Sequence, residues 1–218
     1  EPVREMDVRT VAETMLGSNL SIAPQRYPVD EIDSAWLKRA SFKGTVEFAE
    51  SIASYAQRFR DEALRGADLG FGSNTFSGSW LTERYRSYGR LTVKERIDLL
   101  ASEIVAEMSS RSIGRRVEVP KKNEVRQKLN AMLAAKDALS LYRLFMAEAG
   151  SKSLFTMPAK GTVEWEDACA IAYLQSAFGG FEELAEVKHL LIDEMQDLTP
   201  MQHLLIARLF PCEKTILG

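Results

Sequence analysis

The sequence predicts a mainly α-helical region over residues 1–152, followed by a small α/β segment at residues 153–218. Apolar residues recur every three or four positions through most of the first region, as on one face of a helix. The second contains a short apolar run at residues 187–192, whose length and β-branched ends favour a buried strand. The composition, 45% hydrophobic and 27% charged over 218 residues, is typical of globular chains and excludes collagen, low-complexity and disulfide-stapled proteins.

The first helices are indicated by apolar stripes and by residues that begin or end a helix. Asp7 is suited to cap a helix over residues 8–16, and Gly17 is suited to end it. A second apolar stripe over residues 48–59 has spacings of three and four residues, which predict another helix. Residues 70–78 are rich in Gly, Ser and Asn, so we expect a loop or a short extended segment there.

The middle of the chain carries the clearest helix start. Thr92 and Glu95 form a T-x-x-E capping box ahead of a long apolar stripe. Residues 116–119 alternate between polar and apolar side chains, which permits a short strand. Asn123 is then suited to cap a further helix, and another apolar stripe predicts a helix over residues 138–150.

Charge is unevenly distributed along the chain, although the net charge is only −3. Residues 111–128 contain seven basic and two acidic side chains, whereas residues 164–197 contain nine acidic and one basic. The basic cluster is the best candidate for contact with phosphate groups or a protein partner, and the alternative is a solvated helix face. Its members are Arg111, Arg115, Arg116, Lys121, Lys122, Arg126 and Lys128.

The two cysteines and the hydropathy bear on metal binding, cellular compartment and membrane association. Cys169 and Cys212 lie far apart, and neither has the neighbours of a metal-ligand spacing, so we expect no structural metal. Two free thiols without a secretory signal favour the reducing cytoplasm. No apolar run approaches the roughly 18 residues of a membrane span, so we expect no membrane partner.

A group of acidic residues directly follows the predicted strand. Asp193, Glu194 and Asp197 lie within five positions of one another, with Gln196 among them. Ligands of parallel sheets bind at the carboxyl ends of the strands, so these carboxylates are placed to meet a metal and a nucleotide. Magnesium needs only one or two carboxylates besides phosphates, and a second carboxylate can deprotonate an attacking water. The alternative is an acidic helix-capping region that holds no metal.

The residues after this acidic group carry the signals of a helix followed by a second strand. Thr199 and Gln202 form a T-x-x-Q capping box, and Pro200 fits the first helical position. The helix that follows is expected to bury Leu204, Leu205 and Leu209. Residues 214–217 then begin a second strand, so the order strand, helix, strand predicts a βαβ unit.

One segment resembles motif II, the Walker B motif, of the UvrD/Rep-like superfamily 1 helicases: Leu191-Ile192-Asp193-Glu194-Met195-Gln196-Asp197. The tail, Thr215-Ile216-Leu217-Gly218, is similar to the strand that enters motif III. The resemblance implies a partial RecA-like P-loop NTPase core with parallel strands, ATP and Mg²⁺ as cofactors, and a DNA helicase or translocase as the parent protein. It implies that Asp193 coordinates Mg²⁺, usually through water, and that Glu194 is the catalytic base for ATP hydrolysis. Gln196 and Asp197 would couple the nucleotide site to neighbouring motifs.

A further likeness points to one branch of that family. Residues 162–168 with Tyr173-Leu174, the opening Glu1-Pro2-Val3, and Leu209-Phe210-Pro211 ahead of the tail are similar to HelD-type helicase-like proteins. Proteins of this type bind bacterial RNA polymerase and use ATP to recycle it, and a large helical insertion interrupts their helicase domain 1A. The likeness implies that residues 8–152 are this insertion, which reaches into the polymerase main channel. A UvrD-like 1B domain that contacts DNA is the rival interpretation of the same stretch.

The phosphate-binding loop of such ATPases, G-x-x-x-x-G-K-[ST], occurs nowhere in the sequence. Without its backbone amides and lysine to hold phosphates, Asp193 and Glu194 have no substrate to act on. We therefore expect an internal piece of a larger ATPase that alone neither binds ATP tightly nor hydrolyses it. Two alternatives remain: a pure RNA polymerase-binding arm with no catalytic role in isolation, and a stand-alone helical adaptor with an accidental acidic turn.

Overall fold

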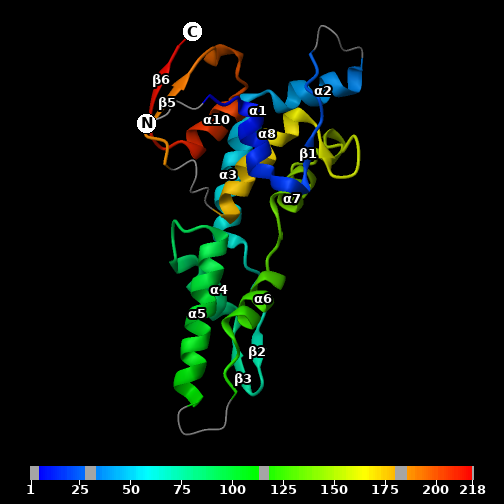
Figure 1. Cartoon of the computed structure of the whole chain (residues 1–218). Helices are drawn as coiled ribbons and strands as arrows, with labels where there is room; N and C mark the ends of the chain where they lie inside the picture. Colours follow the sequence, from blue (N-terminus) through cyan, green and yellow to red (C-terminus); the bar gives the residue numbers. More distant parts are fainter. Residues whose placement is uncertain (1–4, 28–32, 113–117, 180–185, 218) are drawn as a thin grey trace. The chain divides into compact units, whose positions relative to one another are not determined.

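The computed structural model describes residues 5–27, 33–112, 118–179 and 186–217. This part of the chain is mainly helical and contains three small two-stranded sheets (Figure 1). It divides into two compact units: unit 1 takes its residues from 1–56, 138–176 and 180–218, and unit 2 takes them from 57–137 and 177–179. The boundary expected at residue 152 lies inside unit 1, and the first 56 residues group with the α/β segment.

Unit 1 has its most deeply buried helix in α8 (Trp165–Phe178). Ala168, Ile171, Ala172 and Leu174 of this helix are fully buried, as is typical of a helix that is apolar on nearly all sides. The remaining elements are α1 (Val8–Leu16), β1 (Ser21–Ile22), α2 (Ser34–Lys43), the first part of α3 (Val46–Glu62), α7 (Ala138–Glu148), β4 (Thr162–Val163), β5 (His189–Ile192), α10 (Pro200–Leu209) and β6 (Glu213–Ile216), with short 3-10 turns at Gly17–Asn19 (η1), Lys152–Leu154 (η2) and Met195–Asp197 (η3). This set confirms the predicted mixture of helices with a small α/β piece.

The strands β1 and β4 form a parallel pair that local sequence patterns did not predict. Ser21 aligns with Thr162, and their hydroxyl oxygens lie 2.9 Å apart. The pairing joins the beginning of the chain to the residues just before α8, which are 141 positions away. It explains part of the grouping of residues 1–56 with the C-terminal segment.

Two predicted helix starts are confirmed by their hydrogen bonds. The Asp7 carboxylate accepts from the Thr10 amide at 2.6 Å at the start of α1. The Thr92 amide donates to the Glu95 carboxylate at 2.8 Å, directly ahead of α5 (Val93–Ser112). Both contacts supply partners for backbone groups that a helix end leaves unsatisfied.

The start of α6 (Lys122–Ala131) differs from the prediction. Lys121, rather than Asn123, is the N-cap residue, and no side chain caps this helix. The reason lies in the backbone, because the Lys121 carbonyl already accepts from the amides of Glu124 and Val125. The strand expected at residues 116–119 falls partly outside the described residues, and residues 118–120 are not in a strand.

Unit 2 combines the end of α3 with a β-hairpin and three helices. The hairpin pairs β2 (Leu69–Phe71) with β3 (Asn74–Phe76) in antiparallel register, which confirms the extended segment expected there. The helices are α4 (Gly78–Ser87), α5 and α6. At the start of α4, a Cβ on Gly78 would lie 2.5 Å from the Gly66 carbonyl oxygen, so only glycine fits.

Arg96 on α5 is fully buried in unit 2. Its guanidinium donates to the Asp61 carboxylate at 2.9 Å and to the backbone carbonyls of Arg60 and Leu91, and it lies over the Tyr85 ring. A buried cation with this many partners is a structural feature, and it ties α3 to the start of α5.

The expectation that β5 is a buried strand is wrong. Only Ile192 of its four residues is buried, and Leu191 is 62% exposed. Among the described residues β6 is its only neighbouring strand, and β6 itself is exposed along its whole length. The sheet therefore has too few strands and too little cover to bury both faces.

The helix α10 follows the prediction with one exception. Leu205 and Leu209 are buried as expected, whereas Leu204 is only half-buried and Ile206 is buried in addition. The buried face of the helix is therefore turned from Leu204 toward Ile206, while Leu205 and Leu209 stay within it. Across the described ranges, none of the helices combines the length and the apolar character that crossing a membrane would require.

Candidate functional site

The predicted βαβ unit is present in unit 1. Strands β5 and β6 are parallel, with Leu191 opposite Thr215 and Ile192 opposite Ile216, and α10 connects them (Figure 1). Asp193 is the first residue after β5. The acidic group therefore lies at the carboxyl end of a parallel strand, the end at which α/β sheets bind ligands.

Asp193 and Glu194 form an exposed pair of carboxylates at this strand end. The Asp193 carboxylate accepts from the Glu194 backbone amide at 3.0 Å, so the two residues share one tight turn. Glu194 has a left-handed backbone, with φ of 50° and ψ of 44°. It is the one residue other than glycine with a positive φ in the described part of the chain. Such conformations cost of order 1 kcal/mol or more and gather at functional sites.

Gln196 and Asp197 lie in the 3-10 turn η3 but have different surroundings. The Gln196 amide nitrogen donates to the Glu194 carboxylate, which holds that side chain from the far side of the turn. Asp197 is exposed as well, and it lines a cavity of about 190 Å³ together with Thr199 and Gln202. The exposed acidic group thus contributes its last residue to a cavity wall.

The capping box of α10 fixes the chain immediately after the acidic group. The Thr199 amide donates to the Gln202 side-chain oxygen at 2.7 Å, and the Gln202 amide donates to the Thr199 hydroxyl at 3.3 Å. Pro200 occupies the start of the helix, as predicted. The reciprocal bonds limit the freedom of η3 and so help to hold the carboxylates in one place.

The donor set fits a magnesium ion that is held jointly with phosphate oxygens. Hard cations take oxygen ligands, and magnesium commonly keeps several waters while using one or two carboxylates. Asp193 and Glu194 provide two exposed carboxylates on one turn. No group of three or more His, Cys, Asp or Glu side chains suited to a metal occurs among the described residues.

The basic residues predicted for phosphate or partner contact are largely engaged within unit 2. Lys122 and Arg126 both pair with Asp98, at 2.6 and 3.5 Å, and the hydrogen bond from Lys122 lowers the pKa of that carboxyl. Lys128 pairs with Glu124 and lies over the Phe71 ring, and Arg111 pairs with Glu107 and lies over the Phe76 ring. Lys121 is exposed at the N-cap of α6, and Arg115 and Arg116 lie outside the described residues.

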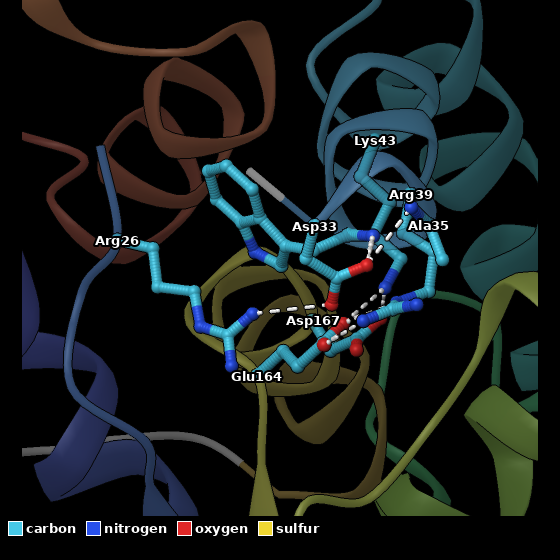
Figure 2. Close-up of polar contacts among 8 residues, drawn as sticks. Arg26, Asp33, Ala35, Arg39, Lys43, Glu164 and Asp167 are labelled. Carbon is cyan, nitrogen blue, oxygen red and sulfur yellow. Dashed lines mark hydrogen bonds and ion pairs between the residues drawn. The ribbon is translucent and has the colours of Figure 1, made fainter. Parts of the chain in front are cut away.

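Unit 1 contains a buried charge cluster that local sequence patterns did not predict (Figure 2). The Lys43 ammonium on α2 lies 2.7 Å from the Asp167 carboxylate and 3.5 Å from the Glu164 carboxylate. Arg39 donates two hydrogen bonds to Glu164, at 2.5 and 2.9 Å. The Tyr142 hydroxyl donates to Asp167 at 2.5 Å, while the second Asp167 oxygen is buried without a partner.

Burial dominates the electrostatics of this cluster. It raises the pKa of Asp167 to about 6, and the neighbouring Lys43 opposes that rise. Burial also raises the pKa of Tyr142 well above its usual value. The sequence signal for this cluster is weak, because Asp167 lies in the first turn of a largely apolar helix, where acidic residues are favoured without any partner.

Comparison of the chain with protein-family models and with curated proteins finds no match.

Proposed function

We propose that this chain supplies the Walker B carboxylates of a UvrD/Rep-like, HelD-type superfamily 1 ATPase and works within a longer polypeptide of the cytoplasm. One observation carries the proposal. Asp193 and Glu194 lie at the carboxyl end of β5, inside a parallel β5–α10–β6 unit. A strand end of this kind is where α/β proteins place nucleotide and metal ligands.

The roles of the individual residues follow from their positions. Asp193 would hold Mg²⁺, usually through water, and the bound ion would supply positive charge against the phosphates of ATP. Glu194 would accept the proton of the attacking water, which a general base must reach within hydrogen-bond distance. The hydrogen bond from Gln196 supports a defined orientation of the Glu194 side chain. Asp197, on the cavity wall, would transmit changes at the site to α2 and α8.

The metal role of Asp193 can be tested in the full-length polypeptide that carries this chain. The substitution Asp193→Asn keeps the shape of the side chain and removes its charge. We expect the Mg²⁺ concentration for half-maximal ATP hydrolysis to rise by about 10- to 100-fold. Glu213→Gln is the matched control, because Glu213 is also exposed on the same sheet but lies at the opposite end of its strand. An unchanged Mg²⁺ requirement would contradict the role given to Asp193.

The isolated chain gives a second test of the same proposal. Since it lacks a G-x-x-x-x-G-K-[ST] loop, we expect no ATP hydrolysis above that of a Glu194→Gln variant. The measurement is phosphate release by the purified chain at saturating Mg²⁺-ATP. Hydrolysis that depends on Glu194 in the chain alone would show that the phosphates have another binding site.

A second candidate function, an arm that binds RNA polymerase, is favoured by the ion pairs of unit 2. Four of the basic residues proposed for phosphate contact are paired with Asp98, Glu107 or Glu124, which leaves less positive charge for DNA. A DNA-binding 1B-like domain should show binding that weakens steeply with salt. We expect the whole chain to capture RNA polymerase and to bind duplex DNA weakly at 150 mM salt. Tight DNA binding without polymerase capture would favour the 1B-like interpretation.

A further inference from the structure

A cavity in unit 1 combines two tryptophans with two carboxylates. It has a volume of about 190 Å³ and is formed by α2, α8, the turn η3 and the start of α10. Trp36, Trp165, Ala40 and Met201 give it apolar surface. A second cavity of about 240 Å³ shares Trp36 and Trp165 with it and extends the same surface toward Pro24 and Pro158. Each cavity is much larger than a single water molecule and has room for the end of a planar side chain.

The cations that line this cavity are already matched by carboxylates of the chain. The Lys43 ammonium is held by Asp167 and Glu164, and an Arg26 nitrogen lies 3.6 Å from the Asp33 carboxylate (Figure 2). Glu166 and Asp197 also line the cavity, and neither forms an ion pair with any other described residue. The cavity therefore presents negative charge that its own cations do not balance.

Besides the two carboxylates, the cavity has tryptophan rings, which can bind a cation through their faces. Arg26 lies with its guanidinium carbon 5.9 Å from the centre of the Trp36 ring, and Arg9 lies 5.8 Å from the centre of the Trp165 ring. Both contacts show that the indole surfaces of this region accept guanidinium groups. A guanidinium can stack on an aromatic face and donate to two carboxylates at once, whereas a lysine ammonium is a point charge without a flat face.

We propose that this cavity binds an arginine side chain of a partner protein, with the guanidinium against Trp165 and between Glu166 and Asp197. Arginine binding here would not require a nucleotide, because it uses only the cavity, its aromatic surfaces and its unbalanced charge. Charge complementarity selects this occupant: the two carboxylates repel phosphate groups, and an uncharged apolar side chain would bring them no countercharge.

The three tryptophans of the chain allow a direct binding test. Indole N–H signals of the whole chain are followed by NMR while N-acetyl-arginine amide is added, with N-acetyl-citrulline amide as the neutral probe of the same shape. We expect the signals of Trp36 and Trp165 to shift with arginine and to shift at least about threefold less with citrulline at equal concentration. Trp80 lies on α4 in unit 2 and is the internal control, so its signal should stay in place. Equal shifts with both probes, or none with arginine, would overturn the proposal.

A variant of one cavity carboxylate tests whether its charge contributes to arginine binding. Glu166→Gln should weaken arginine binding by about threefold, and Glu50→Gln on α3, which changes the charge equally outside the cavity, should leave it unchanged. The circular dichroism spectrum of each variant verifies that it is folded. Equal binding by Glu166→Gln and the parent chain contradicts the role of the carboxylate. Preferential binding of N-acetyl-leucine amide would show instead that the cavity takes an apolar residue.

Discussion

Two pairs of acidic residues in unit 1 differ in nearly every physical property. Asp193 and Glu194 are exposed, have no cation beside them among the described residues, and adopt a strained turn. Glu164 and Asp167 are buried and matched by Arg39 and Lys43. The left-handed backbone of Glu194 has an energetic cost, and strained backbone of this kind gathers at functional sites. Balanced, buried carboxylates join helices and point to structure.

The largest stability effect should come from removing the buried cation. In Lys43→Met the Asp167 carboxylate loses its nearest positive charge, and we expect a loss of about 3 kcal/mol in the free energy of unfolding at pH 8. Its pKa of about 6 already lies above the unfolded value and should rise further, so the protonated acid relieves the cost at low pH. Chemical denaturation at pH 5 and pH 8 should therefore show the smaller loss at pH 5. A larger loss at pH 5 would contradict this assignment.

A smaller effect should follow when the buried pair is replaced as a whole. The double variant Lys43→Met with Asp167→Leu removes both charges and also the Asp167 oxygen that has no hydrogen-bond partner. We expect it to recover about 1–2 kcal/mol relative to Lys43→Met alone, because buried ion pairs are often replaceable by apolar side chains. The comparison uses the same denaturant titration at pH 8. A double variant less stable than Lys43→Met would indicate that the pair does more than balance its own charge.

Removing the helix cap that follows the exposed carboxylates should cost a moderate amount of stability. Thr199→Ala removes the hydroxyl that accepts from the Gln202 amide, and we expect a loss of about 1 kcal/mol in thermal unfolding. Thr199→Ser keeps an acceptor in the same place and is the matched control. Equal losses in the two variants would mean that packing of the threonine methyl group, and not the hydrogen bond, stabilises α10.

The strained backbone of Glu194 predicts a stability difference of similar size. Glu194→Gly and Glu194→Ala both remove the side chain, but only glycine adopts a φ of 50° without steric cost. We expect the glycine variant to be more stable than the alanine variant by about 1 kcal/mol in urea denaturation. The order reverses if the turn relaxes to a negative φ once the glutamate side chain is gone.

Contacts between residues close in the sequence were predictable from it, whereas contacts between distant residues were not. The two capping boxes, at Thr92 and Thr199, need only residues three positions apart, and both are present. The parallel pairing of β5 with β6 also followed from the local order of strand, helix and strand. In contrast, the cation of Asp167 comes from Lys43, and Lys43 has the sequence position of an ordinary basic residue in the last turn of a helix.

Exposure was the other property that the residues alone did not predict. The apolar run of β5 indicated burial on both faces, but burial depends on neighbouring strands and covering helices. With β6 as its only described neighbour, Leu191 stays exposed. The position of the acidic group directly after a strand was predictable, because it depends on consecutive residues and not on what surrounds the strand.

If this chain works within a longer ATPase, as proposed, ATP hydrolysis by that polypeptide with Glu194→Gln most directly tests whether the exposed acidic pair is catalytic. The variant keeps the size of the side chain and removes the base, so we expect hydrolysis to fall by about 10²- to 10⁴-fold while ATP binding persists. The free energy of unfolding should change by less than about 0.5 kcal/mol, because the side chain is exposed. An unchanged hydrolysis rate would contradict the account, and so would a loss of activity that is accompanied by unfolding.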